Sequence, residues 1–372
     1  MNRFLSPLKD ASDRIPYIDL LETVAMLFVI AYHLSNYSYK FLEEPGLLPV
    51  IQYYLRSCLV CCVPLFLTVN GYLLFRHDLN LKKHLLKTLR YALVTLFWAV
   101  ITLLDYNRAY GISSGLRQFF TDLLTWRGGV IHLWYMGALV IIYLIFPVLK
   151  LVYDNDRRLL LYVAAMVAVF TFGNRLLNYV WTIYQGFRGV RQVWATNYNF
   201  FSMFNPVQSI PAYTLVYFCL GAYLPDFLGW LEQFPRKRVN LTASLGLALL
   251  CGVHMVFFWL IWRSMVNYYC PIWYGYETLS GGLITLCMAV LLANYRGENP
   301  KFAKVLKWIS VNTLGVYFIH MAVIYPWKEQ LCAIKPLYNL PCNLICAALV
   351  LALCTAITAL LKKIPLIRYL VS

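Results

Sequence analysis

Apolar and polar residues alternate along this chain in long blocks. A bilayer core about 30 Å thick needs ~20 mostly apolar residues in an α-helix. Windows of about this length, bounded by polar or Pro/Gly-rich segments, occur ten times, near 17–37, 50–75, 87–106, 132–151, 159–177, 208–225, 240–262, 276–294, 309–327 and 342–361. The pattern predicts an all-α, polytopic membrane protein with about ten transmembrane helices, organised as a single domain over residues 1–372.

Composition supports a membrane protein. Hydrophobic residues make up 61% of the chain and charged residues 13%, whereas a soluble domain averages about 25% charged residues. The formal net charge of +16 comes from short basic groups between apolar windows and not from one basic domain, so we expect no nucleic-acid partner. Most of the eleven cysteines lie in apolar windows, which favours packing over disulfides, and we expect no metal or bound cofactor.

The basic residues also predict the topology. One side of the membrane collects 21 of the 32 Lys and Arg residues and the other side 10, with Arg56 inside the second window. Because positively charged short loops stay cytoplasmic, we expect both termini in the cytoplasm. Residues 1–16 lack an apolar core followed by a cleavage site, so the first window is expected to be retained as a span. We expect a multi-pass protein of the inner (plasma) membrane, in contact with its lipids.

The first apolar window contains three ionisable residues, which are costly inside a bilayer and usually face a bundle interior or cavity. Asp19 and Glu22 lie near its cytoplasmic end, and His33 lies in its outer half. Glu22 and His33 are 11 residues apart, which places them on nearly the same helix face, roughly 16 Å apart along the axis. This polar edge predicts the wall of an internal cavity or tunnel.

Two further histidines lie at a similar predicted depth. His132 opens the fourth window, and His320 lies midway along the ninth. A lone His33 is equally well interpreted as a hydrogen-bonded packing residue, but three histidines at one depth indicate a site. Histidine can accept a proton from a hydroxyl and return one to a leaving group, and an intramembrane proton path uses the same residue types. Catalysis and transport therefore both remain open.

The second window contains its own polar features. Arg56 either pairs with a carboxylate or binds an anionic ligand. Pro64 must disturb helix hydrogen bonding, and Asn70-Gly71 allows close approach of a neighbouring helix or a ligand. The basic cluster at 76–90 that follows is either a cytoplasmic topology signal or a phosphate-binding rim.

Several common motifs are absent from the sequence. It contains no P-loop, no dinucleotide-binding glycine pattern, no HExxH and no GxSxG. These absences argue against an ATP-driven pump, a nicotinamide-dependent enzyme and the commoner protease or lipase designs.

Four segments together resemble the membrane acyltransferase-3 family. "IDLLETVAMLFVIAYH" is similar to the family's opening, in which an Asp-x-Leu start is followed by an essential histidine. "VPLFLTVNGYLLF" resembles its second span, "HLWYMGALVIIYLIFPVLK" its His-Leu-Trp segment, and "NTLGVYFIH" its late Tyr-x-x-His segment. The resemblance covers nearly the whole chain, and the segments occur in the family's order and spacing.

The resemblance implies an O-acyltransferase, most simply an O-acetyltransferase, that moves an acyl group from cytoplasmic acyl-CoA to a hydroxyl of a surface polysaccharide, glycolipid or similar acceptor. His33 would be the general base or acyl-handling residue, and Asp19, also counted among the catalytic residues, would hold the start of the first span. Arg14 and the basic residues at 82–90, including Lys82, Lys83 and Arg90, would contact CoA phosphates. Asn70, His132, Trp134 and Tyr317 would shape the site, with Tyr317 beside a catalytic His320.

The chain departs from the family pattern at two places. Glu22 stands where the family usually has Arg or Lys near the acyl donor, and Asn70 replaces the serine of its Ser-Gly. The usual arginine near the Val-Pro is represented by Arg56. Either the donor is bound differently, with Glu22 neutralised by Arg14 or Arg56, or this branch has lost acyl transfer. The alternative function is a non-enzymatic glycan or lipid exporter, which would need no phosphate-binding cations.

Overall fold

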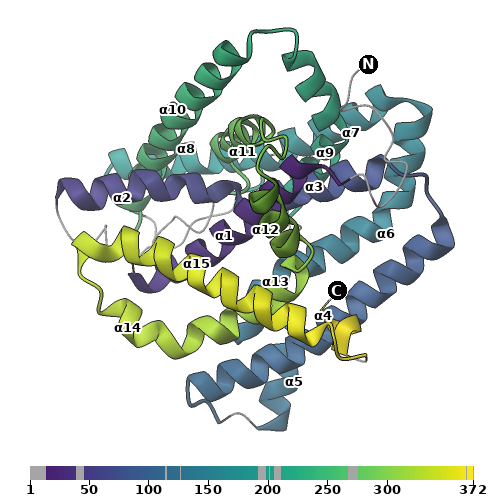
Figure 1. Cartoon of the computed structure of the whole chain (residues 1–372). Coiled ribbons are helices and arrows are strands. Elements are labelled where there is room, and N and C mark those ends of the chain that lie inside the picture. The colour runs from purple at the N-terminus through teal and green to yellow at the C-terminus, as the bar shows by residue number, and fades with distance from the viewer. Residues whose placement is uncertain are drawn as a thin grey trace. The chain divides into compact units, whose positions relative to one another are not determined.

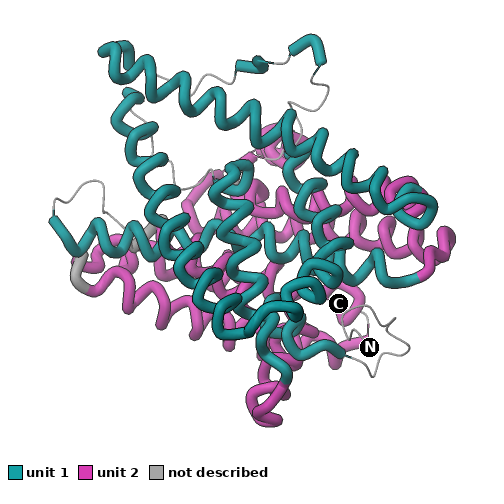
Figure 2. The backbone as a smooth tube through the Cα atoms, turned by 90° about the horizontal axis from the view of Figure 1, so that it is seen from above, with its two compact units in different colours: residues 1–21, 40–77, 152–296 teal, residues 22–39, 78–151, 297–372 magenta. Residues whose placement is uncertain are grey.

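The computed structural model describes residues 14–38, 46–113, 115–125, 127–191, 198–200, 202–204, 211–266, 275–365 and 367–371. Helices account for the regular structure of these residues, and no β-strand occurs among them (Figure 1). The all-α class predicted from the sequence is therefore confirmed. The chain divides into two compact units: unit 1 contains residues 1–21, 40–77 and 152–296, and unit 2 contains residues 22–39, 78–151 and 297–372 (Figure 2).

Helix α1 (Pro16–Ser38) contributes its first residues to unit 1 and the rest to unit 2. The other helices of unit 1 are α2 (Leu47–Ser57), the 3₁₀ turn η1 (Cys58–Cys61), α3 (Cys62–Phe75), α7 (Arg157–Ala168), the π-helical turn η3 (Val169–Gly173), α8 (Asn174–Phe187), α9 (Tyr213–Leu231), α10 (Arg236–Arg263) and α11 (Leu279–Leu292). Unit 2 holds α4 (Leu81–Ala109), α5 (Leu116–Leu124), η2 (Gly128–Leu133), most of α6 (Trp134–Asn155), α12 (Pro300–Ser310), α13 (Thr313–Ile324), η5 (Tyr325–Trp327), α14 (Lys328–Cys332), α15 (Pro336–Leu361) and η6 (Ile367–Leu370).

The apolar windows coincide with these helices. In the described part of the chain, eight helices are long and apolar enough to cross a membrane, or nine if one bent pair forms a single span. That pair is α12 and the segment from Thr313 to Cys332, which meet at 71° over the ninth window. The eighth window forms α11, whose 14 residues are fewer than a full span needs. The polytopic prediction is confirmed, while the side on which the termini lie stays a prediction.

Polar residues start several helices at the positions that helix chemistry favours. The side chain of Asn80 accepts a hydrogen bond from the Lys83 amide at the start of α4, and Asp156 accepts one from Arg158 at the start of α7. Thr278 caps α11, and Asn299 caps α12 with Pro300 directly after it. Each cap satisfies an amide that has no partner within its own helix, so these helix starts are encoded locally.

Close backbone contact between α3 and α9 forms the centre of unit 1. A Cβ atom on Gly71 would overlap the backbone carbonyl of Phe218, and one on Gly221 would overlap the backbone of Thr68. Glycine at both positions lets the helices approach more closely than side chains allow. The close approach predicted at Gly71 is therefore made by a neighbouring helix. Pro64 lies in the first turn of α3, so the expectation that it disturbs the hydrogen bonds of its own helix is wrong, because an amide in the first turn has no partner within the helix. The irregular turn η1 comes directly before α3.

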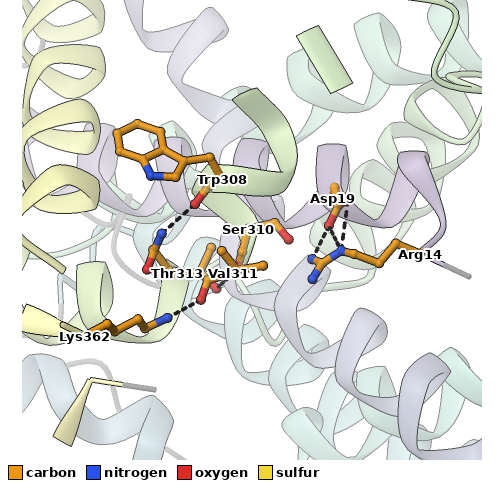
Figure 3. A network of polar contacts seen from close by, with 8 residues as sticks. Arg14, Asp19, Trp308, Ser310, Val311, Thr313 and Lys362 are labelled. Carbon is orange, nitrogen blue, oxygen red and sulfur yellow. Dashed lines mark hydrogen bonds and ion pairs between the residues drawn. The ribbon is translucent and has the colours of Figure 1, made fainter. Parts of the chain in front are cut away.

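In unit 2 the break between α12 and α13 is held by short polar contacts (Figure 3). The Thr313 hydroxyl donates to the Ser310 carbonyl at 2.9 Å, and the Lys362 ammonium donates to the Val311 carbonyl at 2.6 Å. Partial burial lowers the pKa of Lys362 from its ordinary value. These bonds satisfy carbonyls left without helical partners at the end of α12, which stabilises the bend.

Candidate active site

Three histidines from distant parts of the sequence meet in unit 2. The ring centroid of His33, on α1, lies 5.2 Å from that of His320, on α13, and 6.3 Å from that of His132, in η2. The centroids of His132 and His320 are 5.6 Å apart. His132 is buried, His320 is fully buried and His33 is partly buried. We call these three residues the histidine cluster.

Hydrogen bonds to backbone carbonyls set the tautomers of two cluster members. Nδ1 of His132 lies 2.7 Å from the Gly129 carbonyl, and Nδ1 of His320 lies 2.7 Å from the Tyr317 carbonyl. Because a carbonyl only accepts, both Nδ1 atoms must carry the hydrogen. In the neutral rings each Nε2 is then a hydrogen-bond acceptor. Both Nε2 atoms are buried and have no hydrogen-bond partner among the described residues, which is unusual for buried polar atoms and points to a ligand.

A glycine places the carbonyl that orients His132. Gly129 lies in the η2 turn against α4, where an added Cβ would overlap the side chain of Tyr106. Only glycine allows this approach, and the tight turn brings the Gly129 carbonyl back to His132. The sequence interpretation missed Gly129, although the Gly-Gly pair shortly before the histidine was a signal for it.

Tyr317 joins two cluster members. Its hydroxyl donates a hydrogen bond to the His132 carbonyl. Its ring lies 5.9 Å from that of His320 and 5.5 Å from that of Tyr135. Tyr317 therefore connects α13 to the end of η2. Trp134, which was also predicted to shape the site, is partly buried at the start of α6.

A buried asparagine on α15 borders the same region and was missed in the sequence. The side-chain amide of Asn343 donates to the Ala31 carbonyl at 3.1 Å, two residues before His33. Asn343 is fully buried inside an apolar span. Such a residue is costly in a bilayer unless it is hydrogen-bonded, so its position in the tenth window was the available signal.

Asp19 forms an ion pair with Arg14 at the start of α1, within unit 1 (Figure 3). The Arg14 Nε atom lies 3.2 and 3.3 Å from the two carboxylate oxygens, and Nη2 donates to Oδ1 as well. The Asp19 side chain is 8% exposed. The ion pair lies at the start of the first span, and the catalytic and anchoring roles predicted for Asp19 stay predictions.

Glu22 lies in unit 2 next to a group of tyrosines. Tyr91, Tyr135 and Tyr143 are all within electrostatic range of its carboxylate. The Lys87 ammonium lies 5.5 Å from the ring of Tyr91 and 5.4 Å from that of Tyr143. Three tyrosines therefore lie within electrostatic range of Glu22, which the sequence interpretation did not anticipate.

The other predicted donor contacts occupy both units. Lys82 and Lys83 are exposed in the first turn of α4, and Arg90, two turns later, donates to the Tyr369 carbonyl at 3.2 Å. In unit 1, Arg56 is buried at the end of α2. Asn70, which was predicted to shape the site and not to bind the donor, also lies in unit 1, where its amide donates to the Phe66 carbonyl one turn earlier in α3. No three His, Cys, Asp or Glu side chains of the described ranges are arranged to hold a metal ion.

Comparison with known families matched residues 15–361 to the acyltransferase domain of the acyltransferase-3 family. The match contains all three members of the histidine cluster and every other predicted site residue except Arg14, which lies one position before it. No curated protein and no solved structure matched the chain.

Proposed function

Because the chain belongs to the acyltransferase-3 family and is a membrane acyltransferase, we propose that it is an O-acyltransferase that uses acyl-CoA, most simply acetyl-CoA, as donor. The proposed acceptor is a hydroxyl of a surface polysaccharide, a glycolipid or a similar molecule. The observation that supports this function best is the histidine cluster, in which two oriented Nε2 acceptors lie buried beside His33.

In the proposed reaction, His33 removes the proton from the acceptor hydroxyl as its oxygen attacks the thioester carbonyl. The carbon–sulfur bond then breaks, and the proton held by His33 passes to the CoA sulfur. The products are the acyl ester and free CoA thiol, so every atom and proton is accounted for. A histidine is suited to both transfers because its ordinary pKa lies near neutrality.

His320 and His132 are proposed to support the charge that forms on His33. An imidazolium in a buried place is costly unless a hydrogen bond stabilises it. The Nε2 atom of His320 is held ready as an acceptor and can receive a hydrogen bond from the protonated His33 ring. His132 offers a second acceptor for the incoming hydroxyl, which would orient it toward His33.

Cations at the proposed cytoplasmic end would hold the donor. Lys82 and Lys83 are exposed at the start of α4 and are suited to CoA phosphates. Glu22 repels a phosphate, so we assign the hydroxyl-rich surroundings of Glu22 to the uncharged part of the donor. This assignment reconciles the acidic residue at position 22 with acyl-CoA binding.

The proposal is tested with purified protein in proteoliposomes, supplied with radiolabelled acetyl-CoA and the glycan and glycolipid fraction of the producing cells. We expect CoA thiol release that depends on the acceptor fraction, with the label recovered in alkali-labile ester. Liposomes without protein are the control. No binding of acetyl-CoA by calorimetry, together with no labelled ester, would contradict the proposal.

Tyr317→Phe should lower kcat about tenfold and leave KM for acetyl-CoA unchanged. The change deletes the hydrogen bond to the His132 carbonyl, which is worth about 1 kcal/mol, and so loosens two histidines without touching the donor. Steady-state kinetics on proteoliposomes measures both constants. Tyr338→Phe, an exposed tyrosine on α15, is the matched control. Equal loss in kcat and donor affinity would instead indicate a general folding defect.

A further inference from the structure

A cavity of about 230 Å³ lies in unit 1 where α9 ends, α10 begins and α11 ends. Its charged lining consists of Glu232, Arg236 and Arg296, and Asn294 is beside them. Deeper in the helices the lining is apolar, with Leu228, Leu231 and Val290. None of these residues belongs to the proposed acyl-transfer site.

One of the two arginines is fixed in place. Arg236 donates from Nε to the Asn294 side chain at 3.0 Å and from Nη2 to the Asn294 carbonyl at 2.8 Å. Asn294 is itself oriented by a 2.8 Å bond from its amide to the Asn240 side chain. Within the described residues Arg236 makes no other hydrogen bond, so the hydrogens on Nη1 are available to an anion. A fixed cation binds with little loss of side-chain entropy.

The other two charges form a loose pair. Arg296 Nη2 lies 3.7 Å from Glu232 Oε1, and these side chains are 45% and 50% exposed. Exposed pairs of this kind contribute only about 0–1 kcal/mol, so this one contact costs little to break. The cavity therefore presents two guanidinium groups and one carboxylate to the same ligand.

The depth of the cavity narrows the ligand class. The membrane-span candidates Tyr213–Leu231 and Arg236–Arg263 end and begin at its rim, which would place its charges at the level of the lipid headgroups. Capping of α11 explains the bond from Arg236 to the Asn294 carbonyl. Helix capping does not explain why the cavity combines charges of both signs with an apolar part of its lining.

We propose that this cavity binds the headgroup of an aminophospholipid. The phosphate diester would lie between Arg236 and Arg296, and the primary ammonium would pair with Glu232. The start of an acyl chain would rest on Leu228 and Leu231. Charge complementarity selects this occupant, because two cations and one anion match a phosphate with an ammonium better than a purely anionic headgroup. The inference does not depend on acyl transfer.

The test is native mass spectrometry of the full-length protein in detergent, titrated with phosphatidylethanolamine, phosphatidylglycerol and phosphatidylcholine of identical chains. We expect the phosphatidylethanolamine adduct to form about tenfold more tightly than the other two, as one extra charge-assisted contact permits. The Arg236→Gln/Arg296→Gln variant should bind all three equally weakly. Glu232→Gln should keep phosphate binding but lose the preference for phosphatidylethanolamine.

Arg238→Gln is the matched control, because it removes an exposed cation of the same turn that does not line the cavity. It should bind like the unaltered protein. Arg236→Lys keeps the positive charge but loses the pair of hydrogen bonds to Asn294. If the double variant is unstable, this milder change tests lipid binding in a protein that still folds. Equal binding of the three lipids by the unaltered protein would overturn the proposal. Displacement of phosphatidylethanolamine by CoA would also overturn it, by assigning the cavity to the acyl donor.

Discussion

Acyl transfer is expected to fall about 10³-fold when His33 is replaced by alanine. General base catalysis by a positioned histidine contributes roughly 10²–10⁴-fold, and the neighbouring His132 and His320 are each held by a hydrogen bond from Nδ1 to a backbone carbonyl. Neither His132 nor His320 can move into the position of His33 without breaking its own hydrogen bond to a backbone carbonyl. The measurement is the initial rate of ester formation from acetyl-CoA in proteoliposomes, with donor affinity followed separately by calorimetry.

His254→Ala is the matched control for this experiment. His254 is also a buried histidine within a membrane-span candidate, but it lies in unit 1, where its Nδ1 is 2.9 Å from the Ser280 hydroxyl oxygen. It should retain most activity. A His33→Ala variant that binds acetyl-CoA normally and keeps more than about a tenth of the rate would contradict a catalytic His33.

The double variant His33→Ala/His320→Ala sharpens the same prediction. If His320 acts through His33 by accepting its hydrogen bond, removing both should cost little more than removing His33 alone. Residues that act as one unit are strongly non-additive in this way. Additive losses would assign His320 a separate role.

Gly71→Val should prevent stable assembly of unit 1, and Gly71→Ala should lower stability by about 3 kcal/mol, the upper range for overpacking. The added Cβ would overlap the carbonyl of Phe218, which belongs to the backbone and cannot rotate away. Since the Cβ position of Gly221 is blocked in the same contact, α3 and α9 would have to separate along their length. Thermal unfolding of the detergent-purified protein measures the loss.

The control is Gly137→Ala in α6. A Cβ there would meet no atom within 4 Å, so the change removes only the poor helix propensity of glycine. It should be neutral or stabilising by up to about 1 kcal/mol. A Gly71→Ala variant with the same melting temperature as Gly137→Ala would show that the α3–α9 contact is not tight.

Much of the architecture was predictable because the bilayer imposes it on each segment separately. A span must satisfy its own backbone hydrogen bonds and expose apolar side chains, so windows such as 17–37 and 342–361 became helices that local sequence could identify. The order of short motifs was likewise sufficient to identify the acyltransferase-3 family, because a pattern along the sequence can be recognised without knowing which residues are in contact. The exceptions are α11, which is too short for a span, and the bend after α12, where capping chemistry overrides the hydrophobic pattern.

Contacts between distant segments were decided only by the tertiary structure. The sequence placed His33, His132 and His320 at one depth, but a helix can rotate about its axis without changing its hydropathy, so depth alone does not make side chains converge. Close packing fixed that rotation: Gly129 against Tyr106 oriented His132, and Asn343 bound the backbone beside His33. The charge reversal at Glu22 was visible in the sequence. Its tyrosine neighbours were not, because α4 and α6 bring them there from positions far along the chain.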